Sequence, residues 1–223
     1  MLTKEGTEFL IDKGWVMKSK QVLEELYLKI NQERITPSGV DSIEGEVSVF
    51  RFDSLNKMMK FWEEIISDWY KNFQKGDPNI NCWQGAHSWE ALLHLDTEKR
   101  IMGQLKDKGI VSYALSTGST PLDKNLWEFY KKIGLKVRLY PSSKSFDRTY
   151  YVGTYGETIV QLQIPERVSE KIDTFFKKNK SIKKLDLNEL IEIVNLKQQI
   201  KLTVIKNLGM SKQINSSIIS QFD

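Results

Sequence analysis

The chain has 223 residues, of which 40% are hydrophobic, enough for one sizeable core and a small appendage. Lys and Arg number 33 against 29 Asp and Glu, so the net charge of +4 falls short of a dedicated nucleic-acid-binding domain. The single cysteine, Cys82, excludes an internal disulfide and a cysteine-rich zinc site. With no signal peptide or membrane span visible, we expect a cytoplasmic protein.

Two short amphipathic segments open the chain. Residues 3–13 and 18–33 both carry apolar side chains at helical spacing among charged ones. The stretch Thr36-Pro-Ser-Gly39 that follows has the composition of a linker or turn. We therefore expect a helical appendage or arm over residues 1–40 and an α/β ligand-sensing-like domain over residues 41–223.

The next residues predict a strand followed by a long helix. Residues 46–52 alternate apolar and polar side chains, which is typical of a strand. Asp53 or Ser54 then caps a helix that runs to about Gln74 and repeats Leu, Met, Trp, Ile and Phe at three- and four-residue spacing. A stripe of this kind indicates core packing rather than a binding surface.

The middle of the chain predicts a parallel crossover. Ile110 to Leu115 form a nearly continuous apolar run, as in an inner parallel strand covered on both faces. Thr120 can cap the following helix, with Pro121 at its first position and Asp123 returning a hydrogen bond. Residues 136–140 form the next strand, so the unit has the length of a strand, helix, strand crossover.

The last third of the chain combines short strands and helices. Residues 150–154 and 158–164 predict a hairpin, and residues 201–206 another strand. The helices are expected from Pro165 to Phe176, over residues 187–200, and from a Ser211 cap to Phe222. The fold class is therefore α/β, with a mixed, mostly parallel sheet covered by helices and a small N-terminal helical appendage.

The first candidate site is the small-residue loop before the Thr120 cap. Backbone N–H groups from Gly118 to Leu122 would converge at the start of the helix, where a carboxylate or phosphate is accepted. We expect Gly118, Ser119 and Thr120 to bind an anionic or polyol group there. The alternative is a plain connector, because the chain has no G-x-G-x-x-G or Gly-Lys-Ser/Thr motif.

The second candidate site follows the strand at residues 79–83. Trp83, Gln84, His87 and Trp89 gather in a strand-to-helix connection, where small polar residues are the rule. We expect them to line the same pocket as the Gly118 loop, because such connections meet at the carboxyl ends of parallel strands. The tryptophans would stack on a sugar or planar ring. The alternative to a ligand site is that Trp83 and Trp89 are packed in the hydrophobic core.

The sequence does not favour catalysis. His87 and His94 are the only histidines and match no zinc motif, so we expect no metal site and no cofactor. Cys82 and His87 could act as nucleophile and base, but no third group that would orient them is evident. Carboxylates such as Glu63 and Glu98 fall on the polar faces of helices, where solvation explains them. A lysine cluster near residues 177–184 suits a solvated helix end better than a nucleic-acid surface.

Three stretches of the chain resemble a known protein family. They are Gln104-Leu-Lys-Asp-Lys-Gly-Ile-Val-Ser-Tyr-Ala-Leu115, Phe129-Tyr-Lys-Lys-Ile-Gly-Leu-Lys-Val-Arg-Leu139 and Tyr151-Val-Gly-Thr-Tyr-Gly-Glu-Thr-Ile-Val-Gln161. In order and character they resemble the effector-binding half of archaeal TrmB-type transcriptional regulators, which is similar to one lobe of the phospholipase D fold. The resemblance spans residues 45 to 180 by element order. The catalytic phospholipase motif of a histidine with a lysine two residues on is absent at His87 and at His94.

The resemblance implies a non-catalytic ligand-sensing or regulatory domain related to transcription regulators. The expected partners are a small-molecule effector, anionic or sugar-like, and a second copy of the chain in a homodimer, but no membrane. Nucleic acid would be bound only through a partner or a reduced N-terminal reader. Two alternatives stay open: a small-molecule hydrolase using His87 and Cys82, and a weak nucleic-acid-binding protein.

Overall fold

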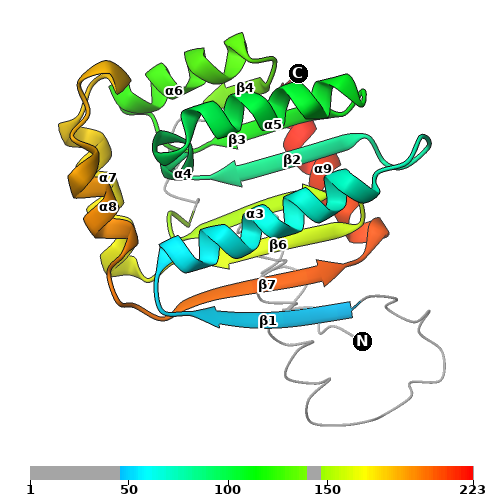
Figure 1. Cartoon of the computed structure of the whole chain (residues 1–223), viewed down its shortest axis with the longest axis horizontal. Helices are drawn as coiled ribbons and strands as arrows, with labels where there is room; N and C mark the ends of the chain where they lie inside the picture. Colours follow the sequence, from blue (N-terminus) through cyan, green and yellow to red (C-terminus); the bar gives the residue numbers. More distant parts are fainter. Residues whose placement is uncertain (1–45, 140–146, 223) are drawn as a thin grey trace, which may run out of the picture. The chain divides into compact units, whose positions relative to one another are not determined.

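The computed structural model describes residues 46–139 and 147–222. Over these residues, seven strands form one sheet in the order β1-β7-β6-β5-β2-β3-β4 (Figure 1). The strands are β1 (Glu46–Phe52), β2 (Ile80–Gly85), β3 (Val111–Ser116), β4 (Lys136–Leu139), β5 (Tyr150–Tyr155), β6 (Thr158–Gln163) and β7 (Ile200–Lys206). The expected appendage over residues 1–40, with its helical segments 3–13 and 18–33, lies outside the described residues.

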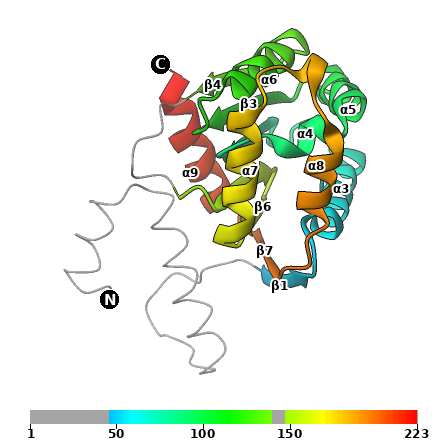
Figure 2. The same ribbon diagram turned by 90° about the vertical axis from the view of Figure 1, so that its left-hand side faces the viewer.

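Helices cover both faces of the sheet and one of its ends. They are α3 (Leu55–Asn72), α4 (Trp89–Leu93), α5 (Leu95–Asp107), α6 (Pro121–Lys132), α7 (Glu166–Lys178), α8 (Leu187–Val194) and α9 (Leu208–Ile219), with short 3₁₀ turns at Ile182–Lys184 and Ser220–Phe222. The helices α3 and α5 lie on one face and α9 lies on the other (Figures 1 and 2). Seen from the side, α7 and α8 stand across the end at which the arrow of β2 points (Figure 2). None of the helices within the described ranges has both the length and the apolar character needed to cross a membrane.

The sheet is mixed, as expected, but it is not mostly parallel. β3 pairs in parallel with β2 and β4, so the predicted crossover over residues 110–140 is confirmed. β5 pairs antiparallel with β2 and β6, and β6 pairs antiparallel with β7. The hairpin turns at Gly156, whose φ of 63° suits glycine. Two helices, α7 and α8, separate β6 from β7 as predicted, and β7 runs antiparallel to β6.

The ends of two elements differ from the sequence prediction. The helix expected over residues 187–200 stops at Val194, because Ile200 is buried and already belongs to β7. The last helix begins three residues before Ser211, since the Asn207 side chain accepts a hydrogen bond from the Met210 N–H at 2.8 Å. Ser211 instead donates its hydroxyl hydrogen to the Gly156 carbonyl. In the sequence alone, a serine that is buried against a turn, such as Ser211, cannot be distinguished from a serine that caps a helix.

The apolar stripe of α9 is covered within the chain itself. Ile214 is 4% exposed and Ile218 is 2% exposed. The ring of Phe222 packs edge-on against Tyr113 of β3, with centroids 5.2 Å apart. The stripe therefore supplies no surface for a second copy, and the homodimer expectation now depends on residues 18–33 alone.

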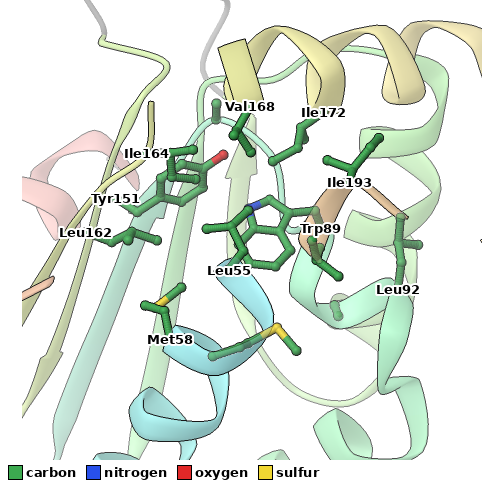
Figure 3. Packing of buried hydrophobic residues seen from close by; sticks show 14 of the residues in the cluster. Leu55, Met58, Trp89, Leu92, Tyr151, Leu162, Ile164, Val168, Ile172 and Ile193 are labelled. Carbon is green, nitrogen blue, oxygen red and sulfur yellow. The ribbon is translucent and has the colours of Figure 1, made fainter. Parts of the chain in front are cut away.

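The main core lies between the sheet and the helices α3, α4, α7 and α8, with Trp89 in its middle. Ser54 caps α3 as predicted, and the first turns of that helix bury Leu55 and Met58. Trp89 is 2% exposed and is surrounded by side chains from five other elements (Figure 3). The labelled neighbours are Leu55, Met58, Leu92, Tyr151, Leu162, Ile164, Val168, Ile172 and Ile193.

We predict that Trp89→Ala lowers the free energy of unfolding by roughly 3–5 kcal/mol, because the void left by the indole cannot be filled by so many fixed neighbours. A matched control is Ile191→Ala on α8, where the side chain is 45% exposed and little packing is lost. Urea denaturation of both variants measures the difference. An equal, small loss in the two variants would contradict the central position of Trp89.

Candidate functional site

The connection between β2 and α4 carries a buried histidine that links two carboxylates. His87 Nδ1 lies 2.9 Å from Asp123 Oδ1, and His87 Nε2 lies 2.7 Å from Asp173 Oδ1. Asp173 also forms an ion pair with Arg148. A carboxylate only accepts hydrogen bonds, so both ring nitrogens donate only when the imidazole is protonated. The arrangement therefore holds a charged His87, which is 4% exposed and stacked on Phe176 with ring centroids 4.3 Å apart.

Asp123 connects this network to the start of α6. Its Oδ2 accepts hydrogen bonds from the backbone N–H and the hydroxyl of Thr120, both at 2.8 Å, while its N–H donates to the Thr120 hydroxyl. The capping box predicted from the sequence is thus confirmed. Since the other carboxylate oxygen faces His87, one side chain both caps a helix and holds the β2–α4 connection.

The network shifts the pKa values of His87 and Asp173. Burial lowers the pKa of His87, but the hydrogen bonds and charges of Asp123 and Asp173 outweigh it and raise the pKa above its ordinary value. Burial raises the pKa of Asp173, but the bonds and charges of His87 and then Arg148 outweigh it and lower that pKa. The ionic form of the network therefore persists from mildly acidic pH upward, until His87 loses its proton.

The signs of these shifts predict how stability depends on pH. The contribution of His87 is present below its ordinary pKa of 6.5 and is lost as pH rises through the raised value. The contribution of Asp173 is present above its ordinary pKa of 3.8 and is lost as pH falls through the lowered value. We predict that His87→Gln costs roughly 3–5 kcal/mol between these limits and progressively less at alkaline pH.

Urea denaturation from acid to alkaline pH, with His94→Gln as the control, tests this prediction. His94 is the other histidine of the chain, and its side chain is exposed. A loss of stability for His87→Gln that stays constant across the whole range would show that the imidazole contributes by packing alone.

The Gly118 loop lies directly against this network. The Gly118 N–H donates to the Ala86 carbonyl at 2.7 Å, and the Thr120 N–H donates to Asp123. The two N–H groups are therefore engaged within the protein. A side chain at position 118 would overlap the Ala86 carbonyl and would lie 2.6 Å from His87 Nδ1 and 2.8 Å from Asp123 Oδ1. Glycine is required here for close approach of two connections.

We predict that Gly118→Ala destabilises the protein by about 1–3 kcal/mol, because the added methyl group pushes the loop away from His87 and Asp123. Gly103→Ala is the control: no heavy atom lies within 4 Å of its added methyl group, and alanine favours the helix. Thermal unfolding compares the two substitutions, and a neutral Gly118→Ala would contradict the tight packing.

A separate cavity of about 120 Å³ lies between α3, α5 and the sheet. Its floor includes Trp83 of β2, Ala114 of β3 and Tyr155 of β5. Its walls come from Trp62 of α3 and from the α4–α5 segment. In Figure 1, α3 and α5 lie on either side of β2, and these three elements contribute many of the lining residues. The lining is mainly aromatic and aliphatic, the composition of a small-molecule site.

Three glutamates also face the cavity. Burial raises the pKa of Glu90 to about 8, and its Oε2 has no hydrogen-bond partner among the described residues. Burial, and next the charge of Glu63, raise the pKa of Glu98 to about 7, although Tyr130 donates a hydrogen bond to it at 3.5 Å. The indole N–H of Trp89 also lacks a well-formed hydrogen bond to any described residue.

These carboxyl groups are the residues that the sequence did not reveal. The prediction of a solvated helix face agrees with the exposed side chain of Glu63, but Glu98 is only partly exposed and burial raises its pKa. Glu90 lies in the first turn of α4. Its position one residue after Trp89, in a connection rich in large apolar side chains, is the signal that indicates burial.

The structure divides the seven predicted site residues between separate places. Trp83 and Trp89 line the cavity. His87 belongs to the buried network, and the loop of Gly118, Ser119 and Thr120 lies beside it. Side chains alternate along a strand, so Gln84 points to the sheet face opposite that of Trp83. The two connections do meet, but α7 covers them through Asp173 and Phe176, and the cavity opens on one face of the sheet instead.

The hydrolase alternative lacks its chemistry. Both ring nitrogens of His87 are engaged by carboxylates, which leaves neither to accept a proton from Cys82. Burial raises the pKa of the Cys82 thiol to about 12, so it is not a thiolate at neutral pH. Within the described residues, no group of three or more metal-ligating side chains is arranged to hold a metal ion.

The lysine cluster after α7 is partly compensated. Lys178 forms an ion pair with Glu189 of α8 at 2.7 Å, and this pair raises the pKa of Lys178. Lys177 and Lys178 also lie in the last turn of α7, where they offset the helix dipole. These contacts explain Lys177 and Lys178 by their structural role, so nucleic-acid binding is not needed to account for them.

The fold is that of an α/β protein with a mixed sheet, and the candidate site is a cavity of about 120 Å³ on one face of that sheet. No protein-family model matches the sequence, and no curated protein matches it either. One similar solved structure is that of TrmBL2, an archaeal chromatin protein, with 11% identity and a TM-score of 0.43 over 98% of this chain and 65% of that one. Another is NucT from Helicobacter pylori, with 11% identity and a TM-score of 0.46 over 79% of this chain and 97% of that one. This chain thus spans about two thirds of the TrmBL2 chain.

Proposed function

We propose that the described part of the chain is a non-catalytic ligand-binding domain, whose ligand occupies the cavity between α3, α5 and the sheet. The observation that carries this proposal is the joint presence of a cavity of about 120 Å³ and buried polar atoms without partners on its lining. Unpaired buried polar atoms are costly, and a cavity beside them is where a ligand would supply the missing partner.

The size of the cavity bounds the ligand. An engineered cavity of about 150 Å³ in another protein takes up benzene. The cavity here is slightly smaller, at about 120 Å³, so it suits a molecule with a body the size of one ring or a short branched chain. A nucleotide or an oligosaccharide is too large to enter it whole.

The same proposal includes a regulatory role. The lining residues Trp62, Glu98 and Tyr155 come from α3, α5 and β5, so an occupant would contact three elements at once. A ligand that fixes their spacing can change a surface elsewhere on the chain. Such a role fits the effector-binding half of the transcriptional regulators that the sequence resembles. DNA binding would require residues outside the described part or a partner, and a homodimer through residues 18–33 remains part of this proposal.

We predict that toluene, phenol or indole, titrated into the protein, changes its intrinsic fluorescence saturably. Three tryptophans, Trp62, Trp83 and Trp89, line the cavity and would report its occupation. Ala114→Leu should abolish the response, because the larger side chain fills the space.

The matched control is Gly103→Leu, which adds the same side chain on α5 at a position with no close neighbours. Cooperative thermal unfolding of both variants shows that each still folds. Binding to Ala114→Leu as tight as to the parent would place the ligand elsewhere, and no saturable response to any of the compounds would contradict a ligand-binding cavity.

A further inference from the structure

The acidic side chains on the lining of the cavity have no basic counterpart. Glu63, Glu90 and Glu98 reach it from α3, α4 and α5, whereas the described lining includes no lysine or arginine. No ion pair joins any of these three carboxylates to a lysine or arginine among the residues described. An anionic ligand would therefore find no positive partner on the described lining, whereas a cationic one would favour the ionised carboxylates and pair with them.

The Glu90 and Glu98 carboxyl groups share the lining with aromatic rings, whereas the Glu63 side chain is exposed to solvent. Trp62, Trp83 and Trp89 contribute indole rings to the lining, and Tyr130 and Tyr155 contribute phenol rings. Aromatic faces attract a cation and also favour an apolar body, so they accept an organic ammonium group better than a hydrated metal ion. The Trp62 indole N–H already donates to the Tyr155 hydroxyl at 2.8 Å, so these two rings are fixed in place.

We propose that the ligand of this cavity is a small organic ammonium cation with an apolar body. This inference rests on the proposed ligand-binding function and adds the chemical class of the ligand. The ammonium group lies at the Glu90 and Glu98 carboxylates, where it donates to the unpaired Oε2 of Glu90. The apolar body lies against the tryptophans and the methionines of α3.

Binding of such a cation is coupled to loss of protons. In the empty cavity, burial raises the pKa of Glu90 to about 8 and that of Glu98 to about 7, so both carry protons for part of the time near neutral pH. A bound ammonium favours their ionised forms and releases those protons. The other titratable groups on the described lining are Glu63, His94, Tyr113, Tyr130, Tyr151 and Tyr155. His87 acts on Glu90 through its charge.

The test compares benzylamine with benzyl alcohol, its neutral isostere, by calorimetric titration of the full chain. We expect benzylamine to bind roughly tenfold tighter or more at about pH 8, because a charge-assisted hydrogen bond is stronger than a neutral one. Its affinity should fall when the pH is lowered to about 6, as Glu90 and Glu98 take up protons, whereas that of benzyl alcohol should not change. Titrations in buffers of different ionisation enthalpy should reveal proton release with benzylamine alone.

Glu90→Gln and Glu98→Gln keep the shape of the lining and remove its charge. Each substitution should weaken the affinity for benzylamine by roughly tenfold and leave the affinity for benzyl alcohol unchanged. Glu64→Gln, on the exposed side of α3, should alter neither affinity. Equal or tighter binding of benzyl alcohol, or benzylamine binding unaffected by both variants, would overturn the cationic class and leave the ligand-binding cavity standing. Binding of neither compound, nor of toluene, phenol or indole, would overturn the cavity function and this inference with it.

Discussion

The ionic hydrogen bonds of His87 hold together the parts of the chain that the sheet alone does not join. Asp123 lies at the first turn of α6, Asp173 in α7, and Arg148 just before β5. Asp123 and Asp173 meet at the imidazole of His87, and Arg148 joins the network through Asp173. A buried charge without partners would be expensive, so the network is stable only when every member is in place.

This network also explains why the crevice at the carboxyl ends of the parallel strands is closed. In open α/β sheets, ligands bind where two strand-to-helix connections diverge. Here the Gly118 N–H donates to the Ala86 carbonyl, which brings the connections after β2 and β3 together. Phe176 of α7 stacks on His87 and covers the point where these two connections meet. The space left in the fold is therefore beside β2, between α3 and α5.

Local patterns determined much of the fold, and long-range contacts determined the site. The Leu55–Trp62 periodicity and the Thr120 capping box are encoded within a few residues, so both could be predicted from the sequence. The pairing of Asp123 with His87 spans 36 positions and leaves no local pattern. Glu98 sits in α5 at a spacing typical of a solvated face, and its place on the cavity lining beside Glu63 of α3 is a long-range feature that no local pattern records. The direction of β7 likewise depends on how α7 and α8 turn, which no strand pattern records.

The two buried polar centres are linked through one short segment. His87 and Glu90 are separated by two residues, and the positive charge of the imidazole lowers the pKa of Glu90 against the larger effect of burial. The start of α4 is thus fixed by the ionic network on one side and carries the cavity carboxylate on the other. A ligand that ionises Glu90 places a negative charge near His87, which favours the protonated imidazole and strengthens its bonds to Asp123 and Asp173. Under the proposed function, occupation of the cavity would therefore stiffen the contacts of α6 and α7 without any ligand touching either network carboxylate.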